Sequence, residues 1–246
     1  MNFCAIDFGH TNYKIAYIEN KDIVSIKRYS YQENAILDEL NILFKNFKCS
    51  KILCASVLNY KVIDSIVSSL PAEMKSILKF FNSSDCLKYI NLAYKNDVYK
   101  LGIDRALGLV SASTKTNKDL IVIDAGTATS IDYLDLNRNH IGGIILPGKK
   151  IIDSIFYEML NFDFFEEDFF KNIFSKNTRS CIENGSLISA YASIDTVLDR
   201  MISTKDVDVE IFLTGGNFRE VIDNCNYSMK HVESLLFDGL VVLDGS

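Results

Sequence analysis

A doubled segment restricts the fold of this 246-residue chain more than any other feature. Residues 3–19 read FCAIDFGHTNYKIAYIE, and residues 120–135 read LIVIDAGTATSIDYLD. Each has an apolar strand ending in Asp-x-Gly, a polar turn and a second alternating strand, a pattern that predicts a β-hairpin. The aspartates of the two copies, Asp7 and Asp124, lie 117 residues apart, close to half the chain. A repeat on this scale predicts two related domains.

The segments after each hairpin continue in α/β order. A third strand is expected after each, over 24–31 and 140–148. We expect further strands over 51–58 and 209–217, and helices near 35–47 and over 60–70, 101–114, 149–161, 180–202 and 233–243. A hairpin, a third strand and then alternating helices and strands predict the α/β class. We therefore divide the chain into domains 1–116 and 117–246.

Composition and charge exclude several classes of protein. Hydrophobic residues make up 48% of the chain and charged residues 24%, which is typical of a globular protein. The net charge of −6 argues against a nucleic-acid binder, which needs a basic surface. The chain has no run of about 20 apolar residues to span a membrane. Its start, MNFCAIDFGH, lacks the basic region of a signal peptide. We expect a cytoplasmic protein.

The six cysteines show no metal-binding or disulfide pattern. No C-x-x-C pair occurs, and no histidine lies closer than six residues to a cysteine in the sequence. Scattered buried thiols in a reducing compartment are the expectation.

The two Asp-x-Gly turns suit a polyphosphate ligand. Glycine lets backbone N–H groups approach phosphate closely, and a carboxylate at a strand end can hold Mg²⁺ directly or through water. Threonine hydroxyls and Lys14 add donors to phosphate oxygens. Either turn alone fits an ordinary hairpin. Two copies in equivalent places favour a nucleotide clasped from both sides of a cleft between the domains.

A third motif, Gly102-Ile103-Asp104-Arg105, precedes an expected helix. Asp104 is either a helix N-cap or the group that accepts a proton from an alcohol during phosphoryl transfer. Arg105 lies where the helix dipole disfavours a cation, which suggests an anionic ligand.

Three further segments have simpler interpretations. Leu213–Asn217 ends a strand in Gly-Gly, which suits either adenine binding or a tight turn into a helix. Gly143–Lys149 spells G-x-x-x-x-G-K, but Pro147 removes a backbone donor and Lys150 replaces the required Ser or Thr, so it is not a P-loop. The segment 162–170, FDFFEEDFF, is expected to form an amphipathic packing or dimer segment.

The ordered set of motifs resembles the type III pantothenate kinases. That resemblance implies two ribonuclease H-like domains of the actin-like ATPase superfamily, with a nucleotide cleft between the domains. It covers almost the whole chain. The matching segments are Asp7–Lys14, Gly102–Arg105, Asp124–Asp132, Gly142–Gly148, Asn177-Thr178, Gly215-Gly216 and Asp238–Leu240.

The resemblance implies transfer of the ATP γ-phosphoryl group to pantothenate, the first step of coenzyme A biosynthesis, by a homodimer. Asp104 becomes the general base, and Asp124 would hold a monovalent cation, K⁺ or NH₄⁺. Asp7 would meet Mg²⁺ through ATP. The implied pantothenate-binding residues are Gly102, Ile103, Asp104, Arg105, Thr178 and Tyr94. The implied ATP-binding residues are Asp7, Phe8, Gly9, His10, Thr11, Asn12, Tyr13, Lys14 and Thr127.

The chain departs from the family pattern at two places. His10 replaces the usual Asn of the first motif, which introduces a titratable imidazole. Tyr94 lies one residue upstream of the family's pantothenate tyrosine, and the proline that normally follows that tyrosine is absent. Two other hypotheses stay open: a kinase of the same superfamily with a different acceptor, and a non-catalytic regulator of the same family.

Overall fold

The computed structural model describes residues 2–31, 40, 49–94, 97–160, 173–204 and 207–245. The chain divides into two compact units, each described below by itself. Unit 1 contains Met1–Asn117, Asn137–Ile141 and Ser234–Ser246; unit 2 contains Lys118–Leu136 and Gly142–Glu233. The first division falls next to the boundary expected from the sequence. The last segment, which the sequence placed in the second domain, belongs to unit 1 instead.

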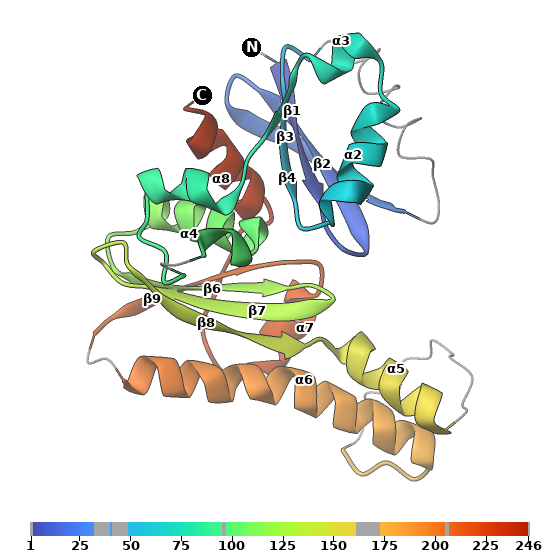
Figure 1. The fold of residues 1–246 in the computed structure, drawn as a ribbon. Coiled ribbons are helices and arrows are strands. Elements are labelled where there is room, and N and C mark those ends of the chain that lie inside the picture. The colour runs from blue at the N-terminus through green and yellow to red at the C-terminus, as the bar shows by residue number, and fades with distance from the viewer. Residues whose placement is uncertain are drawn as a thin grey trace. The chain divides into compact units, whose positions relative to one another are not determined.

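Unit 1 is built on a five-stranded sheet (Figure 1). Its strands are β1 Asn2–Phe8, β2 Asn12–Glu19, β3 Asp22–Ser30, β4 Ile52–Ser56 and β5 Leu78–Phe80. Their order across the sheet is β3-β2-β1-β4-β5. The pairs β1–β2 and β2–β3 are antiparallel, whereas β1–β4 and β4–β5 are parallel.

The sheet of unit 2 repeats this topology. Its strands are β6 Asp119–Ala125, β7 Ala128–Leu134, β8 His140–Pro147, β9 Val209–Thr214 and β10 Lys230–His231, in the order β8-β7-β6-β9-β10. The β6–β7 pair is antiparallel, and β6–β9 and β9–β10 are parallel. In both sheets the strands of a unit therefore lie in the order third, second, first, fourth, fifth. The predicted α/β class with two ribonuclease H-like domains is confirmed.

The helices follow the expected pattern, with additions too short to predict. Unit 1 has α2 Tyr60–Ser68, α3 Ala72–Lys75, the 3-10 helices η1 Ser83–Lys88 and η2 Val98–Lys100, α4 Ile103–Lys115 and α8 Leu235–Asp244. Unit 2 has α5 Lys149–Leu160, α6 Thr178–Ser203 and α7 Phe218–Asn224. The helix expected near 35–47, apart from Leu40, and the segment 162–170 lie outside the described residues.

Each core forms against the central strand of its sheet. From Phe3 to Phe8 every residue of β1 is buried, and all of these residues except Asp7 are apolar. In unit 2, α6 packs on the sheet through Ala190, Ile194 and Leu198, which recur every four residues on one helical face.

Unit 1 is completed by α8, which packs against α4 although more than a hundred residues separate them (Figure 1). A Cβ atom on Gly239 would lie 2.5 Å from the Leu107 carbonyl oxygen, so only glycine permits this approach. Lys115 at the end of α4 pairs with Asp238 at 2.8 Å. The Asp-Gly-Leu sequence at 238–240 therefore has a packing role. Within the described part of the chain, no helix is long and apolar enough to cross a membrane.

Candidate active site

The first turn, Gly9–Thr11, joins β1 to β2. A Cβ atom on Gly9 would lie 2.8 Å from the Asn12 carbonyl oxygen, closer than real Cβ contacts allow. Glycine is therefore required by the path of the backbone. His10 and Thr11 are exposed at the tip of the turn, where their side chains can reach a ligand.

A buried carboxylate stands just before this turn. Asp7 is only 6% exposed, and in the β1–β2 register it lies opposite Lys14. The Lys14 Nζ is 3.6 Å from Asp7 Oδ2. The Lys14 side chain is 26% exposed, so the ammonium group remains open to an anionic ligand while it offsets the buried charge.

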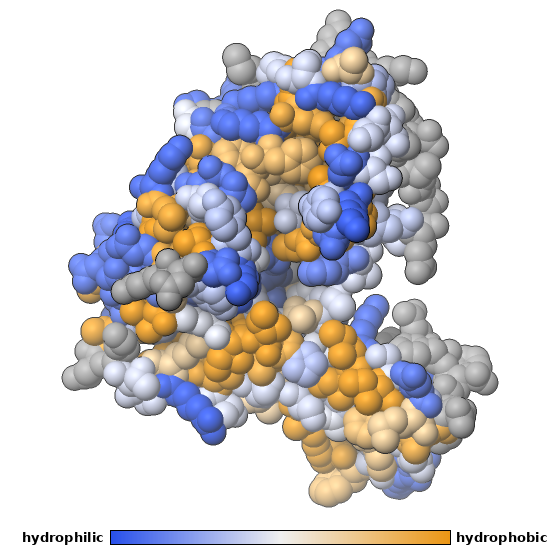
Figure 2. Space-filling model, in the orientation of Figure 1, coloured by the Kyte–Doolittle hydropathy of each residue, from blue (hydrophilic) through white to orange (hydrophobic). Residues whose placement is uncertain are grey.

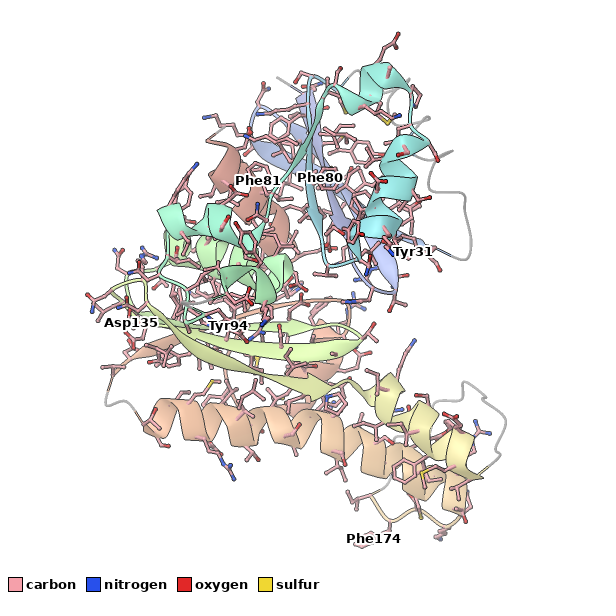
Figure 3. All side chains as sticks on the ribbon, viewed as in Figure 1. Tyr31, Phe80, Phe81, Tyr94, Asp135 and Phe174 are labelled. Carbon is pink, nitrogen blue, oxygen red and sulfur yellow. The ribbon has the colours of Figure 1, made fainter. Side chains whose placement is uncertain are left out.

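A cluster of three tyrosines, Tyr13, Tyr29 and Tyr31, packs beside the first turn. The Tyr31 hydroxyl donates a hydrogen bond to the Gly9 carbonyl at 3.1 Å, and Tyr31 lies at the turn end of the sheet (Figure 3). The buried Tyr13 ring stacks on Tyr29 at 5.0 Å and lies 5.4 Å from Tyr31. Burial, followed by the nearby Asp7 and Tyr13, raises the pKa of the Tyr31 hydroxyl, which keeps it a donor. No sequence motif marks Tyr31, because only strand pairing brings it to the turn.

The second turn joins β6 to β7 around Gly126. The Gly126 N–H donates to the Ala128 carbonyl at 3.0 Å, which closes the turn. Thr127 is exposed at the tip of the second turn, and Asp124 is half-buried just before Gly126. In the first turn, the exposed His10 and Thr11 and the carboxylate of Asp7 hold the corresponding places. The predicted equivalence of the two hairpins therefore extends to their geometry.

Two glycine segments clamp the second turn through backbone contacts. The Gly148 N–H donates to the Thr127 carbonyl at 3.1 Å, and a Cβ atom on Gly148 would lie 2.3 Å from that oxygen. Gly215 has φ +99°, and a Cβ atom there would lie 2.4 to 2.6 Å from the backbone of Ala125. Neither position accepts a side chain.

Asn217 completes the clamp. Its backbone N–H donates to the Ala125 carbonyl at 2.9 Å, and its side-chain Nδ2 donates to the Gly126 carbonyl at 2.7 Å. Three motifs that are far apart in the sequence, around residues 126, 148 and 215, therefore meet at one end of β6. The tight turn expected for Leu213–Asn217 is present, and it leads directly into α7.

The third motif forms the start of α4. Gly102 is the N-cap residue and makes no side-chain capping bond, so the hypothesis that Asp104 is the N-cap is wrong. Asp104 is the second helical residue, and its Oδ1 accepts from the Arg105 backbone N–H at 2.8 Å. A Cβ atom on Gly102 would lie 2.4 Å from that same Oδ1. The absence of a side chain on Gly102 therefore leaves the space that the Asp104 carboxylate occupies.

Within unit 1 the third motif lies next to the end of β1. The Val57 backbone N–H donates to the Phe8 carbonyl at 3.1 Å, and Val57 Cγ1 is 3.9 Å from the Cβ position of Gly102. The buried Ser83 hydroxyl also donates to the Leu101 carbonyl at 2.5 Å, which fixes the approach to α4. Val57 thus lies between the start of α4 and the end of β1, the strand that leads into the first turn.

The two remaining predicted substrate residues are Tyr94 in unit 1 and Thr178 in unit 2. The exposed Tyr94 ring is parallel to the His140 ring at 6.4 Å in unit 1. Thr178 is the exposed first residue of α6 in unit 2, and its neighbour Asn177 caps that helix by accepting from the Ser180 N–H at 2.8 Å.

A family model described as type III pantothenate kinase matches residues 3–200, a range that contains both turns, the third motif and Thr178. The chain belongs to the type III pantothenate kinase family. Type III pantothenate kinases from Sulfurihydrogenibium sp. and Syntrophotalea carbinolica are 25% and 27% identical to it. The alignments cover 98% of both chains in the first case, and 97% of this chain and 96% of the relative in the second.

Solved structures show the same fold at low sequence identity. A Campylobacter jejuni protein named after the Baf family of transcriptional activators aligns with a TM-score of 0.62 at 18% identity, over 99% of this chain and 98% of that one. The activator of 2-hydroxyisocaproyl-CoA dehydratase from Clostridium difficile, solved with bound ADPNP, aligns with a TM-score of 0.54 at 11% identity, over 100% and 95%. The type III pantothenate kinase family and the actin-like ATPase fold are therefore both supported.

Proposed function

We propose that this protein transfers the γ-phosphoryl group of ATP to the primary hydroxyl of pantothenate, giving 4'-phosphopantothenate, the first step of coenzyme A biosynthesis. One observation carries the proposal in this member of the type III pantothenate kinase family. Asp104 and Arg105 lie in the first turn of α4, and Val57 contacts both the start of that helix and the end of β1, the strand before the first glycine turn. An acceptor group and a phosphate-binding turn thus belong to the same compact unit.

In this proposal Asp104 is the general base. Its half-buried carboxylate accepts the proton of the pantothenate hydroxyl as the bond to phosphorus forms. Arg105 holds the pantothenate carboxylate or the transferring phosphoryl group, and its place in the first helical turn keeps it beside Asp104. Gly102, Ile103, Thr178 and Tyr94 are the remaining proposed contacts with pantothenate.

The proposed ATP-binding residues are Asp7–Lys14 in the first hairpin and Thr127 in the second. Backbone N–H groups of a glycine turn suit phosphate oxygens, and Lys14 adds a cation 3.6 Å from Asp7. The buried Asp7 carboxylate is a hard oxygen donor and suits Mg²⁺ carried by ATP, and Asp124 is the proposed site for K⁺ or NH₄⁺. When bound, Mg²⁺ would neutralise charge on the phosphate oxygens.

An exposed apolar face on α5 and α6 supports a homodimer. Met159 is 74% exposed, and Ile155, Phe156 and Ile188 are also exposed. Figure 2 shows apolar side chains gathered over α5, and Phe174, 79% exposed, lies just before α6 (Figure 3). Exposed patches of this kind mark protein interfaces. We propose that a second copy covers this face, and that the dimer works in the cytoplasm without a membrane or nucleic-acid partner.

A panel of acceptors tests the proposed substrate. The protein is incubated with ATP, Mg²⁺, K⁺ and pantothenate, or with other small alcohols and carboxylates. Phosphorylation of pantothenate is expected, and its rate should fall when Na⁺ replaces K⁺. Phosphorylation of another acceptor with pantothenate untouched would favour a different kinase. Sequence-specific DNA binding without ATP turnover would favour the regulator hypothesis, which the name of the Campylobacter jejuni neighbour keeps open.

Replacing the proposed base is the sharpest single test. Asp104→Asn keeps the size and most hydrogen bonds of the side chain but cannot take a proton. Turnover should fall by roughly 10²-fold or more, while ATP affinity and the unfolding midpoint stay close to those of the parent. Wild-type turnover per folded molecule would show that Asp104 is not the base.

Gly102→Ala tests whether the position of that base matters. The new methyl group would meet Asp104 Oδ1, a movable atom, so the carboxylate should turn away while the helix persists. Turnover should fall by up to roughly 10²-fold, with a much smaller change in the free energy of unfolding. Gly185→Ala is the matched control, since nothing lies within 4 Å of that Cβ position. Equal turnover in the two variants would contradict the assigned position.

A further inference from the structure

Two buried cysteines meet between the first strand and the segment before β4. Cys4 Sγ and Cys49 Sγ are 2.9 Å apart, although the residues lie 45 positions apart in the chain. This separation is shorter than the ~3.5–4.0 Å of ordinary non-bonded contact and longer than the ~2.05 Å of a disulfide. Closing the bond requires a movement of about 1 Å.

The sheet imposes this approach. The Cys4 N–H donates to the Lys51 carbonyl at 3.2 Å, and the Ser50 N–H donates to the Asn2 carbonyl at 3.1 Å. These bonds extend the parallel β1–β4 pairing up to the residue next to Cys49. The two sulfur atoms are therefore held together by backbone geometry in addition to side-chain packing.

The two thiols differ in their chemistry. The hydrogen bond between the two thiols lowers the pKa of Cys49 against the opposing effect of burial. The same hydrogen bond, together with burial, raises the pKa of Cys4. Cys49 is also the more accessible of the two, 8% exposed against 0% for Cys4. A thiolate is the nucleophilic form of cysteine, so Cys49 is the member that attacks.

We propose that Cys4 and Cys49 form a reversible disulfide when the protein meets a hydroperoxide, with Cys49 as the attacking thiolate and Cys4 as the resolving thiol. Cys49 Sγ takes the terminal oxygen of the peroxide and becomes a sulfenic acid, and the alkoxide or hydroxide that leaves takes up the proton Cys49 lost. Cys4 Sγ then bonds to Cys49 Sγ, and the released hydroxide leaves as water with the Cys4 proton. Two thiols and one peroxide give one disulfide, one alcohol or water, and one further water. A dithiol reductant reverses the change.

The remaining cysteines provide internal controls. Burial raises the pKa of the Cys54 thiol, and burial with Asp85 raises the pKa of Cys86 to about 12, so both should resist oxidation. Cys181 is exposed and can form disulfides between molecules. The experiment therefore uses the full chain with Cys181→Ser, which leaves five thiols.

The test treats this protein with hydrogen peroxide, then denatures it and counts its free thiols. Five thiols should fall to three, the intact mass should drop by two hydrogen atoms, and a peptide map should join Cys4 to Cys49. Dithiothreitol should restore all five. Retention of five thiols, or a disulfide between any other pair, would overturn the proposal.

Single substitutions distinguish the two roles. With Cys4→Ser, peroxide should leave a sulfenic acid on Cys49 that dimedone traps; with Cys49→Ser, Cys4 should give no adduct. Labelling of Cys4 and not of Cys49 would reverse the assigned order and overturn it. Cys86→Ala is the matched control, and it should leave the loss of two thiols unchanged. Kinase turnover is not the readout, so a failure here is separate from a failure of the proposed function.

Discussion

The first and second turns each join the first two strands of their own sheet, and the two sheets have the same strand order. Different groups hold the two turns in place. In the first, the Tyr31 side chain, just after β3, donates a hydrogen bond to the Gly9 carbonyl, and Lys14 pairs with the buried Asp7. In the second, Gly148 and Gly215 press their backbones against the turn without room for a Cβ atom. One hairpin is supported mainly by side chains and the other mainly by backbone.

This difference predicts how each turn tolerates substitution. A side-chain hydrogen bond contributes about 0.5–1.5 kcal/mol, and its loss leaves the backbone path intact. A backbone contact that excludes a Cβ atom cannot be relieved without moving the chain. The second turn should therefore be the more sensitive to single substitutions. We expect the effect to decrease from Gly215→Ala to Asn217→Ala to Tyr31→Phe.

Gly215→Ala should have the largest effect. Its φ of +99° strains any residue with a side chain, and the new Cβ would lie within 2.6 Å of the Ala125 backbone. We expect a loss of about 3 kcal/mol in the free energy of unfolding of unit 2, measured by urea titration. Gly185→Ala, within α6 and free of nearby atoms, should change it by no more than about 1 kcal/mol. Equal losses in the two variants would remove the argument from backbone contact.

Asn217→Ala should have an intermediate effect. It removes the 2.7 Å bond to the Gly126 carbonyl but keeps the backbone bond to Ala125. We expect a loss of about 2 kcal/mol and a higher KM for ATP, because a part-buried carbonyl loses its partner. Asn224→Ala is the matched control, since it removes a similar 2.8 Å bond to the Glu220 carbonyl on exposed α7. The clamp has no role in ATP binding if both variants keep the parent KM.

Tyr31→Phe should have the smallest effect. It removes the hydroxyl that donates to the Gly9 carbonyl and keeps the ring that packs on Tyr13. We expect a loss of about 1 kcal/mol in the free energy of ATP binding, seen as a roughly 5-fold higher KM for ATP with turnover nearly unchanged. Tyr89→Phe removes an equivalent 2.9 Å bond to the Val242 carbonyl in the same unit and should leave KM unchanged. An effect of Tyr31→Phe larger than that of Gly215→Ala would reverse the comparison.

The architecture could be predicted because the same hairpin pattern occurs in both halves of the sequence. The Asp-x-Gly hairpins at Asp7 and Asp124 fixed the first two strands of each sheet, and α/β order placed the rest. The edge strands β5 and β10 are three and two residues long, too short to carry a periodic pattern. They form because a neighbouring strand offers unpaired backbone groups, a property of the sheet and not of their own sequence.

The support of the site could not be predicted, because strand pairing and close packing bring its members together. Tyr31 reaches Gly9 across 22 residues, and Asn217 reaches Gly126 across 91. The third motif predicts Asp104 as a candidate base, but it does not show that Gly102 is the N-cap of the helix. The pairing of Cys4 with Cys49 likewise depends on the parallel approach of β1 and β4, which no spacing of cysteines encodes.

The packing of α8 on α4 has a consequence for synthesis on the ribosome. Helix α8, which covers α4 in unit 1, follows α4 and all the described strands of both units in the chain. Through all the intervening elongation, the apolar surface of α4 that Gly239 approaches has no native cover. The packing of the first unit is therefore completed only after α8 has been translated, later than every described strand of the second unit.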